Sequence, residues 1–442
     1  MPTFDAERFL FSLAGGLRAG AWADADLRAA LRGAASDRPV RAPGLVPRLL
    51  RRFHGTPGYG ELLLFLVNDP GLARAVDRLT WSRPQPGPAK PAMGQPPPRL
   101  GTLAIPALAT EAALGTWLGV GPDRLRWLAD LTGRNRRHPP GPLRTYRHRW
   151  VPKADGRARL LEIPRPGLKL VQRKILADLL DAVPAHPAAH GFRPGRSAVT
   201  NAAEHCGRAV VVRLDLADFF PSVPAARVSR IFRTLGYPDP VARLLTGLCT
   251  TRVPADVWDT RPNPGPADHP ARVRFAGRHL PQGAPTSPAL ANLAAHRLDR
   301  RLARLATAVG ATYTRYADDL AFSGGNAVRR GAARLARLVA VVAREEGFAV
   351  NPGKTRVMTR AGRQTVTGVV VNARPNLPRA EFDRLKATLT NCVRHGPGGQ
   401  NRGGHADFRA HLAGRVAHLA AVHPGRGRKV WALFDRIAWP AG

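Results

Sequence analysis

Two adjacent acids, Asp318 and Asp319, lie between short apolar runs in a stretch whose other residues favour β-structure. Carboxylates resist burial unless they are paired or bind a cation, so such a segment carries two of them only at a cost. A tight hairpin would point both into one cleft, where they could hold divalent metal for phosphoryl or nucleotidyl transfer. Taken alone, however, paired acids in a turn are most often a solvated hairpin tip.

A third acid, Asp215, follows the apolar run Val210–Leu214, which is typical of a buried strand. If this strand neighbours the hairpin, three carboxylates meet and form a two-metal site. Mg²⁺ suits it, because this ion takes hard oxygen ligands and keeps waters that leave room for substrate phosphates. One ion would activate a primer hydroxyl and the other would stabilise the leaving pyrophosphate. Standing alone, the segment reads as an amphipathic strand that ends in a capping Asp.

Between these acids, residues 280–288 are rich in Pro, Gly and Ser and predict a turn, followed by a helix over residues 289–305. The start of that helix would place backbone donors near an anion. A turn that merely caps a helix is the alternative.

In this order, the motifs resemble the palm motifs of reverse transcriptases. The residues that carry the likeness are Asp215-x-x-Asp218-Phe219-Phe220, then Leu280–Gly283 with Ser287-Pro288, then Tyr316–Asp319. His190–Ser197 resembles a fingers motif of bacterial retroelement enzymes, and Gly347–Thr355 resembles the next palm motif. Asn201-Ala202-x-x-His205 and Val366–Gly368 resemble the pair that marks retron reverse transcriptases, and the whole likeness spans residues 104–440.

The resemblance implies an α+β fold, a right-hand polymerase with fingers, a palm with a ferredoxin-like sheet, and a helical thumb. Residues 101–150 would be a helical lead-in, 151–372 the fingers and palm, and 373–442 the RNA-binding thumb. A strand hairpin over residues 144–161 would turn at Asp155-Gly156, and the Pro- and Arg-rich stretch 250–279 would be a surface loop near the template.

Ahead of the likeness, apolar residues such as Phe9, Leu13 and Leu17 recur at helical spacing and predict a helical N-terminal extension over residues 1–81. The Pro-rich stretch 82–100 predicts a linker. The motifs leave open whether the extension docks a partner, clamps RNA or only stabilises the chain.

The resemblance also assigns catalytic roles. Asp215, Asp318 and Asp319 would hold two Mg²⁺ ions, and Lys354 would give a proton to the pyrophosphate, since an ammonium both pairs with phosphate and releases a proton. Lys354 is one of only seven lysines in the chain.

Other positions would bind substrate and nucleic acid. On the hairpin, Arg159 rather than Arg157 would reach the incoming triphosphate, with Lys153 nearby. Phe220 would exclude a ribose 2′-hydroxyl, or would simply belong to the core beside Phe219. The remaining assigned residues are Gln282 for the incoming nucleotide, Asn201 and His205 for template RNA, and Val366, Thr367 and Gly368 for the primer end. A buried structural histidine is an equal alternative for His205.

The resemblance implies a structured noncoding RNA as template and primer, deoxynucleotides as substrates, and a branched RNA–DNA product that serves antiphage defence with an effector protein. Template removal would need a host ribonuclease H. Three rivals remain open: a group II intron-like or other defence-associated reverse transcriptase, a noncatalytic RNA-binding scaffold, and a DNA-binding regulator built on a helix-turn-helix within residues 102–137.

Composition agrees with a nucleic-acid partner. The 442-residue chain has a formal net charge of +37, which favours binding to phosphate backbones. Its three widely spaced cysteines support neither a disulfide framework nor a zinc site. Without a membrane-length apolar run or a secretion signal, we expect a cytoplasmic protein.

Overall fold

Two compact units make up the chain, residues 1–90 and residues 91–442. The computed structural model describes residues 6–33, 42–81, 92–97, 102–152, 158–262 and 269–440. None of the helices in these ranges is both long and apolar enough to cross a membrane.

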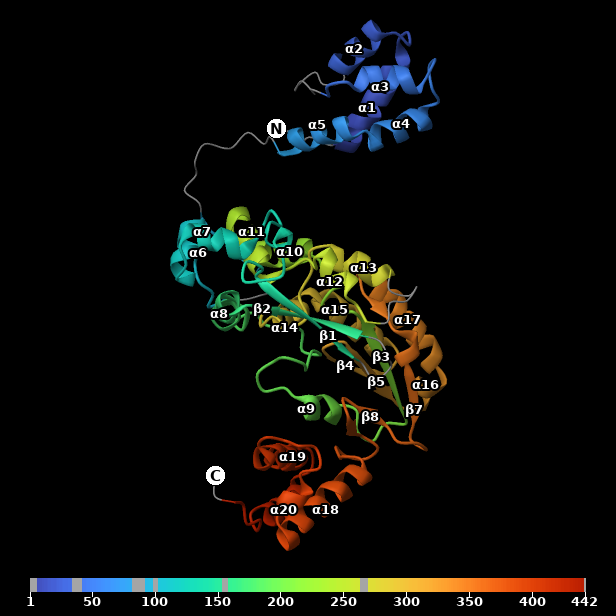
Figure 1. Cartoon of the computed structure of the whole chain (residues 1–442). Helices are drawn as coiled ribbons and strands as arrows, with labels where there is room; N and C mark the ends of the chain where they lie inside the picture. Colours follow the sequence, from blue (N-terminus) through green and yellow to red (C-terminus); the bar gives the residue numbers. More distant parts are fainter. Residues whose placement is uncertain are drawn as a thin grey trace. The chain divides into compact units, whose positions relative to one another are not determined.

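The first unit is a set of helices around a leucine-rich core. Leu13, Leu17 and Leu49, which recur at helical spacing in the sequence, are fully buried there. An ion pair of 2.6 Å between Arg48 and Asp69 fastens the third helix to the start of the fifth. The described helices are α1 (Ala6–Ala19), α2 (Asp24–Gly33), α3 (Leu45–Arg52), α4 (Tyr59–Asn68) and α5 (Pro70–Trp81) (Figure 1). Most of the predicted linker lies outside the described residues.

The second unit begins with two short helices, α6 (Glu111–Leu118) and α7 (Pro122–Ala129). The Thr110 side chain caps α6 by accepting a hydrogen bond from the Ala113 amide at 3.0 Å, and Gly119 ends it in the left-handed conformation. Both helices contribute buried leucines to the main core and pack against α11 (Asp239–Cys249). They therefore act in the fold as packing units.

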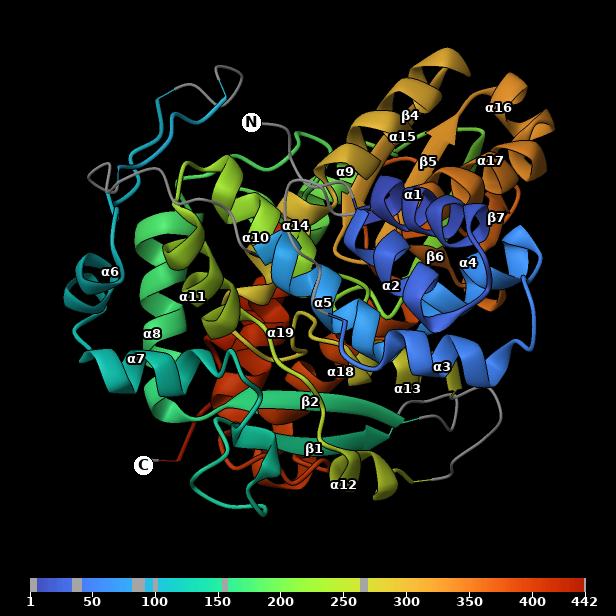
Figure 2. The same ribbon diagram turned by 90° about the horizontal axis from the view of Figure 1, so that it is seen from above.

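A two-stranded antiparallel hairpin follows, formed by β1 (Tyr146–Pro152) and β2 (Ala158–Pro164), which lie side by side in Figure 2. The predicted turn, with Lys153 and Arg157, falls outside the described residues. The sequence predicted a surface loop over residues 250–279, and this prediction was wrong for part of the stretch. It forms α12 (Ala255–Asp259) and α13 (His269–Ala276), because Val253 and Phe275 pack with Leu160 in a small core of their own.

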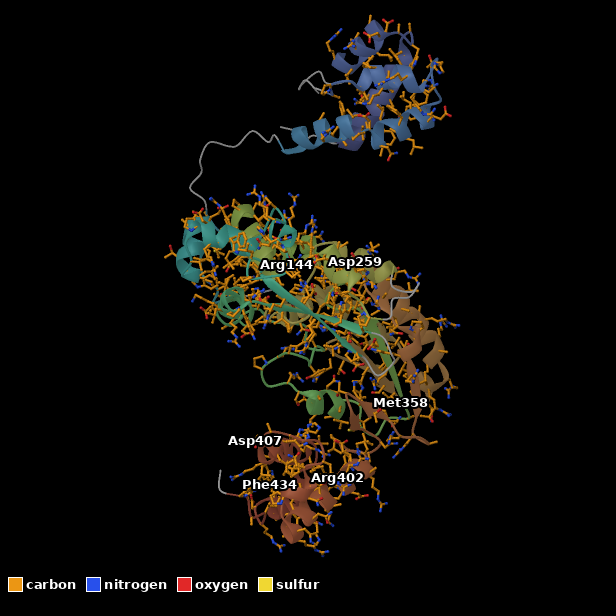
Figure 3. The ribbon with its side chains drawn as sticks, in the orientation of Figure 1. Arg144, Asp259, Met358, Arg402, Asp407 and Phe434 are labelled. Carbon is orange, nitrogen blue, oxygen red and sulfur yellow. The ribbon has the colours of Figure 1, made fainter. Side chains whose placement is uncertain are left out.

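Arg144, just before this hairpin, joins it to α12. The guanidinium is almost fully buried and makes two hydrogen bonds to the Asp256 carboxylate, at 2.8 and 3.0 Å. Figure 3 shows Arg144 among the side chains of this region.

The central sheet is antiparallel, with the strand order β4-β5-β3-β6. These strands are β3 (Val210–Ala217), β4 (Ala311–Tyr316), β5 (Asp319–Gly324) and β6 (Ala349–Val350), and β7 (Arg356–Thr359) also pairs with β3. Strand β3 is buried on both faces, which explains why apolar residues occupy most of its positions. Val210, Val212 and Leu214 enter the main core, while Val211 joins a second core on the opposite face.

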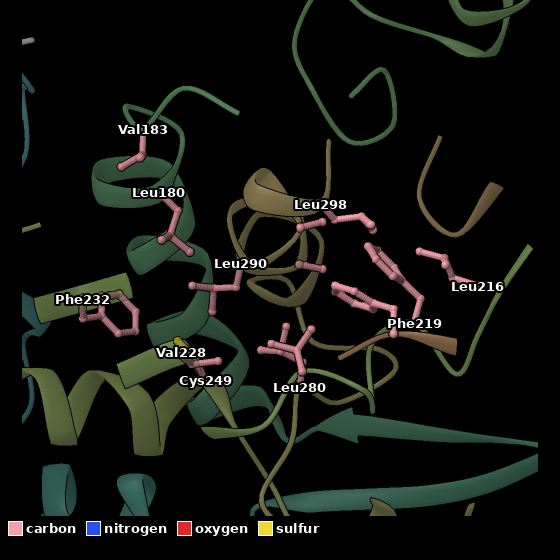
Figure 4. Close-up of a cluster of buried hydrophobic side chains, with 14 of the residues drawn as sticks. Leu180, Val183, Leu216, Phe219, Val228, Phe232, Cys249, Leu280, Leu290 and Leu298 are labelled. Carbon is pink, nitrogen blue, oxygen red and sulfur yellow. The ribbon is translucent and has the colours of Figure 1, made fainter. Parts of the chain in front are cut away.

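Helices surround the main core, which Figure 4 shows around Leu216, Phe219 and Leu290. The helix predicted over residues 289–305 is two helices, which meet at Ala295. The helices of this region are α8 (Pro166–Ile175) with a π-helical turn over Leu176–Leu180, α10 (Ala225–Thr234), α14 (Ser287–Ala294), α15 (His296–Ala308), α16 (Asn326–Arg330) and α17 (Ala332–Glu345).

The second core holds the C-terminal part of the unit. The short strands β8 (Thr365–Val366) and β9 (Val369–Val370) pack with α9 (Ala198–Ala203). Helices α18 (Arg379–His395), α19 (Phe408–Val422) and α20 (Pro424–Phe434) complete it, and a glycine-containing segment after His395 separates the first two. The protein is thus an α+β protein. In its second unit, the central sheet separates the main core from the second core.

Candidate active site

Strand pairing brings the acids of two distant segments together. Asp215 on β3 lies opposite Asp319 on β5, and the Leu216 amide donates a 2.8 Å hydrogen bond to the carbonyl of Asp318. Directly opposed residues share one face of a sheet, with Cβ atoms about 5 Å apart. The convergence predicted from the sequence is therefore a consequence of this register.

The β4–β5 turn is tight and strained. Tyr316 pairs with Asp319, so that Ala317 and Asp318 alone form the turn, and Ala317 has a φ of 55°. A non-glycine residue in this region of backbone space needs support from its surroundings. Gly191 lies against the turn so closely that a Cβ there would stand 2.7 Å from the Ala317 nitrogen, so this position accepts no side chain without a shift.

That support comes from Arg315, whose side chain is fully buried. Its guanidinium donates to both carboxylate oxygens of Asp299, at 2.8 and 2.6 Å, and Asp299 is itself fully buried. The guanidinium also donates to the Asn292 side-chain oxygen at 2.9 Å and to the carbonyl of Ala317 at 3.1 Å. Since the Asn292 amide donates to the carbonyl of Gly191 at 2.9 Å, one network holds both sides of the turn.

The acids at the turn repel one another. Burial raises the pKa of Asp318, and the neighbouring charges of Asp215 and Asp319 raise it further, against the opposing effect of Lys354. The Lys354 ammonium donates to Asp215 at 2.9 Å, and the Asn351 amide holds the Asp215 carbonyl at 2.7 Å. A cationic group thus already stands at the carboxylate where a metal ion would bind.

Asp319 is placed differently. Its carboxylate accepts a 3.1 Å hydrogen bond from Arg213, while Asp215 and Asp318 line a common cavity. In the described ranges no group of three or more His, Cys, Asp or Glu side chains is arranged to hold a metal ion. Two repelling carboxylates on one cavity nevertheless provide the oxygen ligands that Mg²⁺ takes, so the residues present fit this ion.

The cavity has a volume of about 570 Å³. Besides the two acids it is lined by the other residues that the sequence assigned to catalysis and substrate, which are Arg159, Phe220, Gln282 and Lys354. It is also lined by Trp150, Phe192, Trp258, Arg261 and Arg274, which sequence reasoning did not assign.

Phe192 could have been found from its motif. It has a φ of 60°, and its half-exposed ring lies 6.2 Å from the ring of Phe220 and 6.3 Å from that of Tyr316. Arg274 pairs with Asp218 at 2.5 Å, a contact that gave no signal in the sequence.

Buried charge also fixes the Gln282 loop. The backbone N–H of Gln282 donates to the Glu162 carboxylate at 3.1 Å, and the backbone N–H of Glu162 donates to the backbone carbonyl of Gln282 at 2.9 Å. His279 lies 3.1 Å from the same carboxylate. Burial lowers the pKa of His279, but the charge and hydrogen bond of Glu162 outweigh this, and the pKa is raised overall. The loop is therefore tied to strand β2.

The two retron-like signatures meet in the structure. Asn201, on α9, and His205, just after it, are both buried. Val366 lies in one core with Ala202 of α9, and the Thr367 hydroxyl donates to the carbonyl of Ala198 at 3.0 Å. The ring nitrogens of His205 lie 2.7 Å from the Ser323 and Thr314 hydroxyls. Their burial favours the structural alternative for His205, and any effect of Asn201 or His205 on RNA would be indirect.

Comparison with known proteins agrees with this geometry. The family of reverse transcriptases (RNA-dependent DNA polymerases) matches residues 151–380. The retron Mx65 reverse transcriptase of Myxococcus xanthus is 44% identical over 336 residues, which cover 75% of this chain and 73% of the relative. The chain belongs to the retron-type reverse transcriptases.

Further relatives extend the match. The retron Mx162 enzyme of Myxococcus xanthus is 38% identical, over 75% of this chain and 67% of its own length, and the retron Ec86 enzyme of Escherichia coli is 31% identical, over 55% and 69%. This reverse transcriptase is therefore an RNA-directed DNA polymerase, and neither the noncatalytic scaffold nor the DNA-binding regulator is supported.

We predict that Arg315→Met destabilises this reverse transcriptase by about 3–5 kcal/mol, because the change leaves the Asp299 charge buried without its partner. Urea unfolding of the unmodified protein, of Arg315→Met and of Arg315→Met/Asp299→Leu measures the free energy of unfolding of each. The double variant should recover much of the stability, since the orphaned charge is gone, but polymerase activity should stay low because the Ala317 carbonyl is no longer held. A loss below about 1 kcal/mol in the single variant would contradict the role of the network.

His205 should make stability depend on pH. Burial, helped by the nearby His190 and Arg208, lowers its pKa to about 3. Because an unfolded histidine titrates near pH 6.5, the unfolded state binds the proton first, and stability falls as the pH drops below that value. The loss attributable to His205 should be about 2 kcal/mol at pH 5.

Urea unfolding between pH 7 and pH 5 checks this prediction. His205→Gln should flatten the pH dependence, although His190, whose pKa is lowered to about 4 chiefly by burial, leaves a remainder. His395→Gln, at an exposed site on α18, is the control and should change nothing. An equally steep pH dependence in His205→Gln would be evidence that other groups are responsible.

Proposed function

We propose that this reverse transcriptase copies a cognate structured noncoding RNA by two-metal nucleotidyl transfer. The observation that supports this most directly is the single cavity onto which Asp215, Asp318 and Lys354 open together with Phe220 and Gln282. The acids, the cation and the candidate nucleotide contacts thus lie within reach of one bound substrate.

In this proposal Asp215, Asp318 and Asp319 hold two Mg²⁺ ions, for which Asp319 would turn away from Arg213. When bound, the ions supply activation of the primer hydroxyl and stabilisation of the pyrophosphate. Movement of Lys354 from Asp215 towards the triphosphate would let its ammonium release a proton to the leaving group. As Lys354 left Asp215, a metal ion would take its place, so the Asp215 carboxylate would keep a positive partner.

The other cavity residues select the substrate. Arg159 would pair with the triphosphate of a deoxynucleotide, and the Gln282 side chain would contact the nucleotide from a loop whose backbone is fixed by Glu162. The ring of Phe220, braced by Phe219 and Phe192 at 5.6 and 6.2 Å, would clash with a 2′-hydroxyl.

The RNA contacts are also proposals. We assign the C-terminal helices α18–α20 to the thumb, and the β1–β2 hairpin to the fingers. Arg415, Arg426, Arg428 and Lys429 on α19 and α20 would contact the phosphates of the structured RNA. Thr367 and Gly368, near α9, would support the primer end.

The curated relatives are retron enzymes, which suggests the product. We infer a branched RNA–DNA hybrid, with synthesis primed from a 2′-hydroxyl of the RNA and the template trimmed by a host ribonuclease H. Use of the hybrid in antiphage defence with an effector protein, and a cytoplasmic location, complete the proposal. Residues 1–81 have no assigned role in it.

Asp318→Ala should abolish DNA synthesis while the RNA remains bound. Protein expressed with its native flanking DNA is purified, and its nucleic acid is run on a denaturing gel with and without RNase and DNase. A discrete DNA band that shifts with RNase and is absent from Asp318→Ala would support the branched product. Asp239→Ala, an exposed acid on α11, is the control. RNA without DNA in the unmodified protein would contradict retron-type synthesis.

Phe220→Ala should relax the choice of sugar, because removal of the ring leaves room for a 2′-hydroxyl. Single-nucleotide incorporation of ribonucleotides against deoxynucleotides measures the selectivity ratio, which should fall at least tenfold, about 1.4 kcal/mol of discrimination. Phe219→Ala, beside it but buried in the core, is the comparison. An unchanged ratio in Phe220→Ala would leave the ring with a packing role only.

A further inference from the structure

A second hollow, of about 440 Å³, lies next to the active-site cavity. The two share Trp258 and Phe275 among their described lining residues. Its size is that of a small-ligand site rather than of a duplex groove. The other described lining residues are Arg136, Arg137, Val253, Pro254, Ala255, Arg272 and Ala276.

Positive charge gathers here from two distant segments of the chain. Arg136 and Arg137 follow α7, whereas Arg272 lies on α13, and the described lining residues include no acid. Arg272 pairs with Asp259 at 3.8 Å, with both side chains more than half exposed, so the carboxylate competes weakly for the guanidinium. Planar guanidinium groups match the geometry of phosphate oxygens.

The wall between the two hollows is aromatic and rigid. The Trp258 ring is held edge-on by Trp150 at 5.6 Å and contacts Phe275 at 5.5 Å, and Phe275 in turn is packed against His279 at 5.1 Å. The Arg261 guanidinium, which lines the active-site cavity but not the hollow, lies over the Trp258 ring at 5.5 Å. A partly exposed indole beside arginines is an arrangement that binds unpaired bases, because every base has a face that can stack.

We propose that this hollow binds an unpaired nucleotide of a single strand, with the base on Trp258 and the adjoining phosphates on Arg137 and Arg272. The inference rests on the proposed function, since the shared wall connects the hollow to the cavity where the strand is copied. A duplex cannot present a base there while its bases are stacked and paired. An acidic peptide would use the arginines but would leave the aromatic wall without a purpose.

The test compares two double variants of the full chain. Arg137→Glu/Arg272→Glu reverses charge on both sides of the hollow, at exposed positions. Arg329→Glu/Arg330→Glu makes the same change of charge at exposed positions on α16, which line neither hollow. Binding of a short oligouridine, a short oligothymidine and a short duplex is measured by fluorescence anisotropy at several salt concentrations.

Single-strand affinity should fall at least tenfold in the first variant and stay within about twofold in the second. The plot of log affinity against log salt should become less steep by about 1.4, because two phosphate contacts are lost and each contributes about 0.7 on a single strand. The RNA and DNA oligonucleotides show which strand the hollow prefers. Unchanged single-strand affinity, an equal loss for the duplex, or displacement of the oligonucleotide by a short polyglutamate through this site would overturn the proposal.

Crosslinking gives a readout that does not depend on a variant. A 4-thiouridine oligonucleotide, irradiated on the unmodified protein, should mark the peptide that contains Trp258, and crosslinks found only elsewhere would overturn the proposal. The first variant should still add one nucleotide to a primer–template with a minimal overhang. Absence of that addition in the unmodified protein would instead refute the proposed function, so the two failures can be told apart.

Discussion

The buried ion pair between Arg315 and Asp299 is the interaction on which the active site depends. Two fully buried charges are costly to desolvate, and they persist because hydrogen bonds satisfy them on every side. The same guanidinium holds the carbonyl of Ala317, at the strained turn that carries Asp318. Through Asn292, it also fixes the chain at Gly191. These hydrogen bonds stabilise the strained turn, and the acids can therefore lie close together although they repel one another.

Buried charge recurs around the cavity with the same logic. Glu162 and His279, both buried, hold the loop of Gln282 against the β1–β2 hairpin, and the buried Arg144 holds that hairpin against α12 through the half-exposed Asp256. Each pair joins segments that are far apart in the chain. The cavity is thus assembled from separate elements by paired charges, which leave exposed charge free for nucleic acid. At the hollow beside Trp258, exposed arginines from two distant segments lie next to the cavity in the same way.

The sequence could single out the acids because a catalytic motif carries its chemistry in residue types and spacing, and their catalytic role stays a proposal. It anticipated that Asp215 would meet the acids of the turn at 318 and 319, whereas the contact between the two retron-like signatures became visible only in the structure. It could not show that Asp319 turns to Arg213, or that Asn201 and His205 are buried, since a helical spacing of four says which residues share a face but not what covers it. The helices α12 and α13 were missed because a small tertiary core, not periodicity, stabilises them.

The sequence by itself determined the family, the α+β class and the strand that carries Asp215, and it singled out the acids that we propose to be catalytic, because these follow from the order and spacing of residues along the chain. Only the tertiary structure decided which charges are paired, which aromatic rings line the cavity, and which arginines converge near Trp258. Those facts depend on segments more than a hundred residues apart that the fold brings together, as it does Arg137 and Arg272 at one hollow, and no local pattern of residues encodes such an arrangement.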